Sequence, residues 1–148
     1  MRKYILCLIG CIFLITSCTG ETLVKKEEIN NIYIEIINEE DKRIDKIEIK
    51  EKDVEKIKDI ISNKKTYVDS GFVFAEGKYR IVLENVDGNI NLYPYCGSMS
   101  TIRVGEKSDE YLTLQDKKEE QLEDVVNKYV NIDKVGGIWE WSEYIGKE

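Results

Sequence analysis

The spacing of hydrophobic residues predicts a hairpin in the first part of the chain beyond residue 30. Isoleucines occupy every second position from Ile32 to Ile36, which is the period of a half-buried strand. An acidic turn at residues 38–41 follows, and Ile47 and Ile49 indicate a second strand. Two short strands joined by a turn predict an antiparallel pair.

Two segments have the longer period of an amphipathic helix. The first begins near Glu51, and the second near Asp116, which can cap its helix together with Glu119 three residues later. Each segment has an apolar stripe, formed by Val54, Ile57, Ile60 and Ile61 in the first and by Leu122, Val125, Val126, Tyr129 and Val130 in the second.

Residues 78–96 predict a second hairpin, with Asp87-Gly88 at the centre of a type I′ turn. That turn places Leu83 opposite Leu92, on an apolar face that also contains Tyr79, Ile81, Pro94 and Cys96. The other face is expected to be half-wet, and it contains Arg80, Val82, Glu84, Asn91, Tyr93 and Tyr95. Pro94 cannot donate a ladder hydrogen bond, so its strand is expected at an edge or with a bend at that residue.

Two more short strands are indicated at residues 100–104 and 110–114. The predicted order is β-β-α-β-β-β-β-α, with tight hairpins and no βαβ repeat. This order predicts an α+β domain, with an antiparallel sheet of about five or six strands and two helices packed on one face.

The N-terminus has the layout of a bacterial secretory signal. Arg2 and Lys3 precede an apolar run of 11 residues, Ile5 to Ile15, which as a helix would rise only about 16 Å against a hydrocarbon core of about 30 Å. Ile15-Thr16-Ser17-Cys18 resembles the lipobox of bacterial lipoproteins. The resemblance implies that a diacylglyceryl group is attached to Cys18 and that residues 1–17 are removed.

This reading divides the chain into a signal peptide (1–17), a lipid-anchored tether (18–30) and one domain (31–148). It predicts an extracytoplasmic lipoprotein held on the cell membrane through Cys18, because two acyl chains give stable anchoring. Removal of residues 1–17 leaves 20 basic and 29 acidic side chains, a formal charge of −9. That charge disfavours nucleic acid as a partner. It also means that attraction to anionic lipid is not expected to strengthen the membrane anchor.

A second resemblance rests on the segment Tyr93-Pro94-Tyr95-Cys96-Gly97. The segment follows one predicted strand and precedes another strand and the final helix. It is similar to a Pro-Tyr-x-Gly segment in small domains of unknown function in Gram-positive lipoproteins. This resemblance covers about residues 31–130. It implies the same sheet-and-helix fold and brings no activity with it.

The composition excludes several chemistries. The chain contains no histidine, which removes the commonest general base and zinc ligand. Once Cys7 and Cys11 leave with the signal and Cys18 is lipidated, Cys96 is the remaining cysteine, so no intramolecular disulfide can form. No metal site, cofactor or catalytic residue is predicted, and the chain is expected not to be an enzyme.

Aromatic residues are the candidate contacts for an envelope protein or a small ligand, because Tyr and Trp are enriched at binding hot spots. They are Tyr93 and Tyr95, and Trp139 and Trp141 in the C-terminal segment. The tryptophans could instead pack on their own sheet. The leading hypothesis is a non-catalytic binding or accessory module of the envelope. The alternatives are a structural or assembly lipoprotein and a cell-wall hydrolase that uses two carboxylates.

Overall fold

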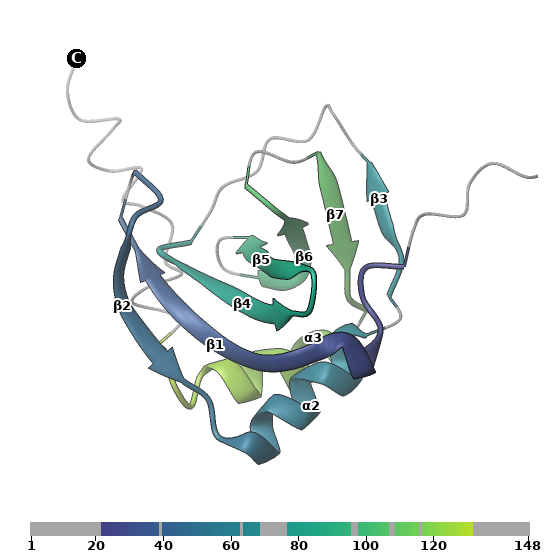
Figure 1. The fold of residues 1–148 in the computed structure, drawn as a ribbon, viewed down its shortest axis with the longest axis horizontal. Coiled ribbons are helices and arrows are strands. Elements are labelled where there is room, and N and C mark those ends of the chain that lie inside the picture. Colours follow the sequence, from purple (N-terminus) through teal and green to yellow (C-terminus); the bar gives the residue numbers. More distant parts are fainter. Residues whose placement is uncertain are drawn as a thin grey trace, which may run out of the picture.

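The computed structural model describes residues 22–131, except for residues 39, 63, 69–76, 96–97, 107–108 and 116. Seven strands, two α-helices and one short 3-10 helix form the described part of the chain (Figure 1). In chain order they are η1 (Lys26–Glu28), β1 (Ile29–Ile37), β2 (Arg43–Glu48), α2 (Glu51–Ile61), β3 (Thr66–Val68), β4 (Tyr79–Asn85), β5 (Gly88–Tyr95), β6 (Ser98–Val104), β7 (Glu110–Thr113) and α3 (Lys117–Val126).

The strands form one sheet in the order β2-β1-β4-β5-β6-β7-β3, and all neighbours are antiparallel. The chain leaves the sheet at edge strand β2, continues through α2 and returns at the other edge as β3 (Figure 1). The predicted α+β class, with an antiparallel sheet and two helices on one face, is confirmed. The sheet has seven strands, because the unpredicted three-residue strand β3 completes one edge.

The ordered domain begins earlier than the predicted boundary at residue 31. Thr22 forms an isolated antiparallel bridge with Lys65, and the Leu23 amide donates to the Lys64 carbonyl at 2.8 Å. Val24 is buried, with 3% of its surface exposed. The prediction of a tether as far as residue 30 is therefore wrong, because apolar Leu23, Val24 and Ile29 belong to the folded domain.

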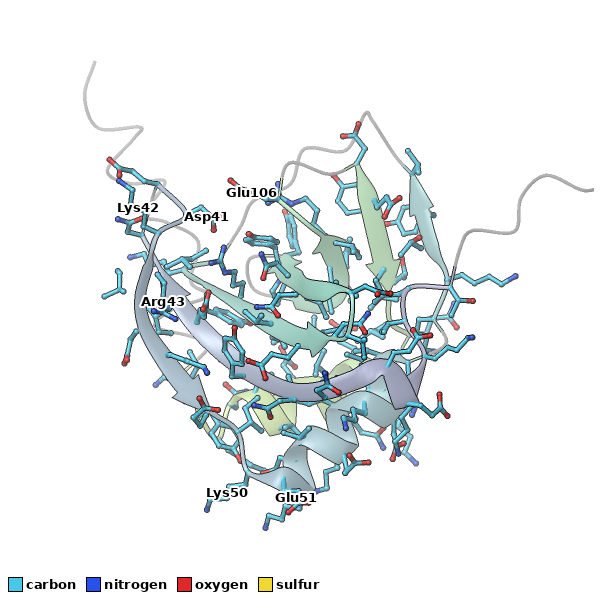
Figure 2. All side chains as sticks on the ribbon, viewed as in Figure 1. Asp41, Lys42, Arg43, Lys50, Glu51 and Glu106 are labelled. Carbon is cyan, nitrogen blue, oxygen red and sulfur yellow. The ribbon has the colours of Figure 1, made fainter. Side chains whose placement is uncertain are left out.

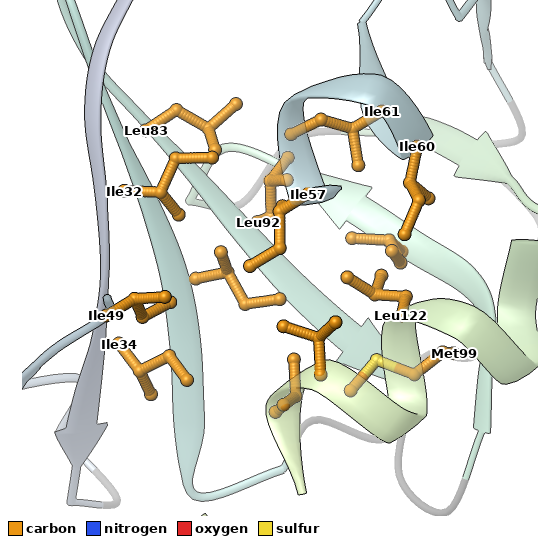
Figure 3. Close-up of a cluster of buried hydrophobic side chains, with 14 of the residues drawn as sticks. Ile32, Ile34, Ile49, Ile57, Ile60, Ile61, Leu83, Leu92, Met99 and Leu122 are labelled. Carbon is orange, nitrogen blue, oxygen red and sulfur yellow. The ribbon is translucent and has the colours of Figure 1, made fainter. Parts of the chain in front are cut away.

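The two predicted helical stripes face the sheet and form the core with it. Val54, Ile57, Ile60 and Ile61 of α2 are all buried, and α3 contributes Leu122, Val125 and Val126. Figure 3 shows side chains from both helices packed against isoleucine and leucine side chains of the strands, with Ile57, Ile60, Ile61 and Leu122 from the helices and Ile32, Ile34, Leu83 and Leu92 from the strands. The amphipathic period therefore identified both helices and the side that each one buries.

The hairpin of β4 and β5 differs from its prediction in register. Asn85 pairs with Gly88, and Leu83 pairs with Ile90 in place of Leu92, so the turn is centred on Val86-Asp87. Gly88 has a φ of +125°, whereas neither Val86 nor Asp87 has a positive φ. A type I′ turn needs positive φ at both central residues, so the predicted type I′ turn is wrong. The shift is two residues, so each side chain stays on its predicted face.

The second face of this hairpin is drier than predicted. Val82 is 1% exposed and Tyr93 is 0% exposed, although both lie on the face opposite to the helices. Strand β5, which Pro94 led us to expect at an edge or with a bend, lies inside the sheet between β4 and β6. Regular pairing is interrupted next to Pro94, where the β5–β6 register shifts between Pro94 and Tyr95.

Candidate functional site

A continuous row of polar and aromatic side chains crosses all seven strands on the face opposite to α2 and α3. Directly paired residues in neighbouring antiparallel strands share a face. Arg80 and Tyr93, on neighbouring strands, are joined by a hydrogen bond. The other neighbouring strands are each joined by one directly opposed pair: Lys46–Glu35, Glu35–Arg80, Tyr93–Arg103, Arg103–Tyr111 and Tyr111–Tyr67. We call these seven residues the cross-sheet row.

Arg80 is the centre of a charged cluster within the cross-sheet row. Its Nε and Nη2 atoms lie 2.8 Å and 2.7 Å from Glu35 Oε2. Its Nη1 atom donates to the Tyr93 hydroxyl at 3.0 Å and to Asp41 Oδ2 at 3.1 Å. The side chains of Glu35 and Arg80 are only 8% and 15% exposed. The cluster therefore holds two carboxylates on one guanidinium in a largely water-excluded place.

Tyr93 connects this cluster to Arg103. Its hydroxyl donates to Asp41 Oδ2 at 2.9 Å, and its ring centroid lies 4.7 Å from the Arg103 guanidinium carbon and 5.9 Å from that of Arg80. Cations at such distances over a ring are attracted by its quadrupole. Burial raises the pKa of Tyr93 to about 12, and its hydrogen bond to Asp41 acts in the same direction. Tyr93 therefore stays protonated and serves as a hydrogen-bond donor at neutral pH.

Arg80 remains charged in this setting. Burial alone would lower the pKa of Arg80, but the hydrogen bonds to Glu35 and Tyr93 oppose this and raise the pKa above its ordinary value. The cluster offers fixed charges and hydrogen bonds, and neither Arg80 nor Tyr93 has a pKa suited to accept or release a proton near pH 7.

Asp41 reaches the cluster from the β1–β2 loop, residues 38–42. Within this loop the Asn38 side chain accepts hydrogen bonds from the backbone amides of Glu40 and Lys42, at 3.0 Å and 2.9 Å. Asp41 has a φ of +57°, a left-handed conformation that aspartate tolerates better than most residues. Figure 2 shows Asp41 on the side of the loop nearer to the other strands and Lys42 on the outer side.

A groove between α2 and α3 is a second candidate site. Its volume is about 630 Å³, and its lining consists of Lys56, Asp59, Ile60, Lys118, Gln121, Asp124, Val125 and Lys128. All eight residues belong to the two helices or to the turn after α3. The groove therefore lies on the side of the helices and is separate from the cross-sheet row.

A group of hydrogen bonds around Asp53, which we call the Asp53 latch, involves the groove residue Lys128. The Asp53 side chain is buried, with 1% of its residue surface exposed. It accepts from Lys128 at 2.9 Å and from the Tyr129 hydroxyl at 2.7 Å, while Tyr129 accepts from the Lys50 amide at 3.1 Å. The hydrogen bonds from Lys128 and Tyr129 lower the pKa of Asp53. The latch joins the first turn of α2 to the turn that follows α3.

Comparison with protein-family models, curated proteins and solved structures finds no match to this chain. Its function therefore has to be argued from the geometry. Within the described residues, no three Cys, Asp or Glu side chains are grouped so that they could hold a metal ion. No described helix is both long enough and apolar enough to cross a membrane.

The predicted contact residues have different positions. Tyr93 has no exposed surface and serves the charged cluster, whereas Tyr95 is half-buried on the same strand. Cys18, Trp139 and Trp141 lie outside the described residues, as do Cys96 and Asp116. The sequence placed Arg80 and Tyr93 on one face, but it did not identify Glu35 or Asp41 as their partners.

Proposed function

We propose that this chain is a lipoprotein anchored through Cys18 on the extracytoplasmic face of the cell membrane, and that its domain is a non-catalytic binding module. The anchor is supported by Arg2 and Lys3, the short apolar run after them and the small residues before Cys18. The binding role is supported by the groove between α2 and α3.

The position of Thr22 limits how far the domain can stand from such an anchor. Residues 19–21 alone separate Cys18 from Thr22, which bridges to Lys65 at the edge of the domain. Four residue steps span at most about 14 Å. The domain of a protein lipidated at Cys18 is therefore held at the membrane surface, with the edge around Thr22 and Lys65 nearest to the lipid.

The groove carries the proposal that the domain binds a ligand. Its volume of about 630 Å³ is within the range of about 300–1,000 Å³ that is usual for small-molecule sites. Ile60 and Val125, each 3% exposed, give the lining an apolar part. The remaining lining residues are charged or polar, and these can fix the orientation of a bound molecule.

The charges of the lining favour an anionic ligand. Lys26, from outside the groove, lies 2.6 Å from Asp59 and balances its charge, and Asp53 similarly balances Lys128. Asp53 also lies 3.8 Å from Lys56. The lining and these two neighbours therefore contain four lysines and three carboxylates, which leaves one positive charge in excess. This excess is local, because the whole chain has a formal charge of −7.

A titration with small anions tests the groove. We expect inorganic phosphate or citrate, added at constant ionic strength, to shift the NMR signals of Gln121 and Lys56 in a saturable way. Lys118→Glu should weaken this binding at least tenfold, because it replaces an attraction by a repulsion. Lys52→Glu is the matched control, since Lys52 is an exposed lysine of α2 outside the groove. Equal weakening by both variants, or no saturable shift, would contradict the proposed site.

The anchor has its own test. Cys18→Ala should abolish incorporation of a labelled fatty acid and release the protein from the membrane fraction, because no diacylglyceryl acceptor remains. Labelling that persists in the variant would contradict the lipoprotein proposal and would leave the groove proposal standing.

The charged cluster gives no comparable support to a carboxylate-dependent hydrolase. Such an enzyme needs one carboxylate to activate water or attack the substrate and the other to donate a proton. Glu35 and Asp41 both accept hydrogen bonds from Arg80, and Glu35 is 8% exposed. These contacts favour a fixed ion pair over proton transfer.

A further inference from the structure

The Asp41 carboxylate occupies a place that two donors of the sheet define. Arg80 Nη1 and the Tyr93 hydroxyl both point to Asp41 Oδ2, at 3.1 Å and 2.9 Å. These two donors belong to neighbouring central strands, β4 and β5, whereas Asp41 is on the β1–β2 loop. The donors are therefore held by the sheet, and the acceptor is delivered by a loop.

Glu35 does not compete for this place. It takes the Nε and Nη2 edge of Arg80, so Nη1 is the part of the guanidinium that is left for another acceptor. The Arg103 guanidinium lies against the Tyr93 ring, 4.7 Å from its centroid.

Asp41 satisfies the place imperfectly. Its other carboxylate oxygen, Oδ1, is buried and has no hydrogen-bond partner, although the great majority of buried polar atoms have one. Asp41 also has the left-handed φ of +57°, which costs free energy for a residue with a side chain. Its neighbours Asn38, Glu40 and Lys42 are exposed, so few packing contacts hold the loop down.

We propose that Arg80 and the Tyr93 hydroxyl form a binding site for the carboxylate group of another molecule, and that Asp41 fills this site in the absence of that molecule. The site has two donors that converge on one oxygen, which suits a carboxylate. A phosphate dianion would bring a second negative charge to a guanidinium that Glu35 already neutralises. An incoming carboxylate displaces Asp41, and its second oxygen need not take the buried, unpartnered position of Asp41 Oδ1. This site does not depend on the groove or on lipidation.

Asp41→Gly provides the test, because glycine removes the carboxylate and adopts a φ of +57° without strain. In the purified full-length chain, sodium acetate should raise the melting temperature of Asp41→Gly by several degrees, with a rise that grows with the logarithm of the acetate concentration above its dissociation constant. Sodium chloride at the same ionic strength should not. Acetate should also shift the NMR signals of the Arg80 Nε–H group and the Tyr93 ring. The parent should need a much higher acetate concentration, because its own carboxylate competes intramolecularly.

Two controls make the result specific. Asp45→Ala removes an exposed carboxylate from the same hairpin, and we expect no acetate-specific change in its melting temperature. The double variant Asp41→Gly with Tyr93→Phe lacks one of the two donors and should lose most of the acetate response.

Three outcomes would overturn the proposal. The first is an acetate response as large in Asp45→Ala as in Asp41→Gly. The second is unchanged Arg80 and Tyr93 signals at saturating acetate. The third is tighter binding of phosphate than of acetate, which would show that the site is not selective for carboxylates. If Asp41→Gly does not fold, Asp41→Ala also removes the acceptor from the site, and the same titration and the same NMR signals decide.

Discussion

Arg80 on β4 lies directly opposite Glu35 on β1, and their charged atoms approach to 2.7 Å. The pair is separated by 45 positions in the sequence and lies on the face of the sheet away from the helices. Arg43 adds a weaker contact, 3.5 Å from Glu35 Oε1. The centre of the cross-sheet row is therefore an ion pair whose partners are held by strand pairing and not by a loop.

Removal of Glu35 should destabilise the domain strongly. Glu35→Ala leaves the Arg80 guanidinium largely buried with Asp41 as its remaining carboxylate partner, and a broken buried pair typically costs about 3 kcal/mol or more. The control is Glu48→Ala on β2, whose exposed carboxylate pairs with Lys46 at 2.7 Å. It should cost less than about 1 kcal/mol, as surface ion pairs do. Urea denaturation of both variants measures the difference, and similar unfolding free energies would contradict the importance of the Glu35–Arg80 pair.

The turn between β4 and β5 can be tested at Gly88. Its φ is +125°, and a Cβ added there would meet no atom within 4 Å. A loss of stability in Gly88→Val would therefore come from the backbone conformation alone, which β-branched residues resist. We expect a loss of roughly 1 kcal/mol or more in unfolding free energy. Val86→Ser is the neighbouring control, because Val86 is 74% exposed and its replacement should change the free energy by less than about 0.5 kcal/mol. A Gly88→Val midpoint equal to that of Val86→Ser would show that the positive φ is unimportant.

Local periodicity was sufficient to predict most of the fold. The apolar residues from Val54 to Ile61 recur with the period of a helix, so the short local sequence is enough to show which side of the helix is buried. The β4–β5 register was wrong because the prediction placed Asp87 in a positive φ. In the structure the two-residue turn is at Val86-Asp87, and Gly88 after it has the positive φ. Strand β3 was absent from the predicted order because three residues are too few to show a period, and the stretch from Tyr67 could be assigned to a loop or to an irregular strand.

The candidate site could be predicted only in part, for a different reason. Alternation along one hairpin placed Arg80 and Tyr93 on the same face, because that inference is local. Glu35 belongs to a strand that pairs with β4 across a long stretch of intervening sequence, and a single sequence contains no local signal for such a pairing. The position of the Asp41 carboxylate next to Arg80 and Tyr93 depends on the conformation of the β1–β2 loop, which the sequence pattern does not predict. The groove depends on the packing of two helices that are distant in the sequence.

The core can be tested with two isoleucines that differ mainly in burial. Ile57 on α2 is 0% exposed and Ile44 on β2 is 66% exposed. Ile57→Ala removes methyl and methylene groups from a packed interior and leaves a cavity, so it should cost about 2–5 kcal/mol. Ile44→Ala makes the same chemical change at the surface and should cost less than about 1 kcal/mol. Chemical denaturation compares them, and equal losses would show that α2 does not pack on the sheet as described.

The Asp53 latch predicts a definite dependence of stability on pH. Hydrogen bonds from Lys128 and Tyr129 lower the pKa of Asp53 below its ordinary value of 3.8. A carboxyl group whose pKa is lower in the folded state contributes stability that is present above its unfolded pKa and is lost as the pH falls through its folded pKa. The parent should therefore be more stable than Asp53→Asn by a constant amount above about pH 5, because the neutral amide cannot pair with Lys128. The difference in unfolding free energy should narrow below about pH 4.

Asp59→Asn is the control on the same helix. The pKa of Asp59 is also lowered, by Lys26, but the Asp59 side chain is 61% exposed. Solvent screening therefore makes the effect of this variant on stability smaller. Unfolding free energies measured between pH 2.5 and pH 7 decide, and a gap between parent and Asp53→Asn that stays constant to the lowest pH would show that the Asp53 charge does not fasten α2 to α3.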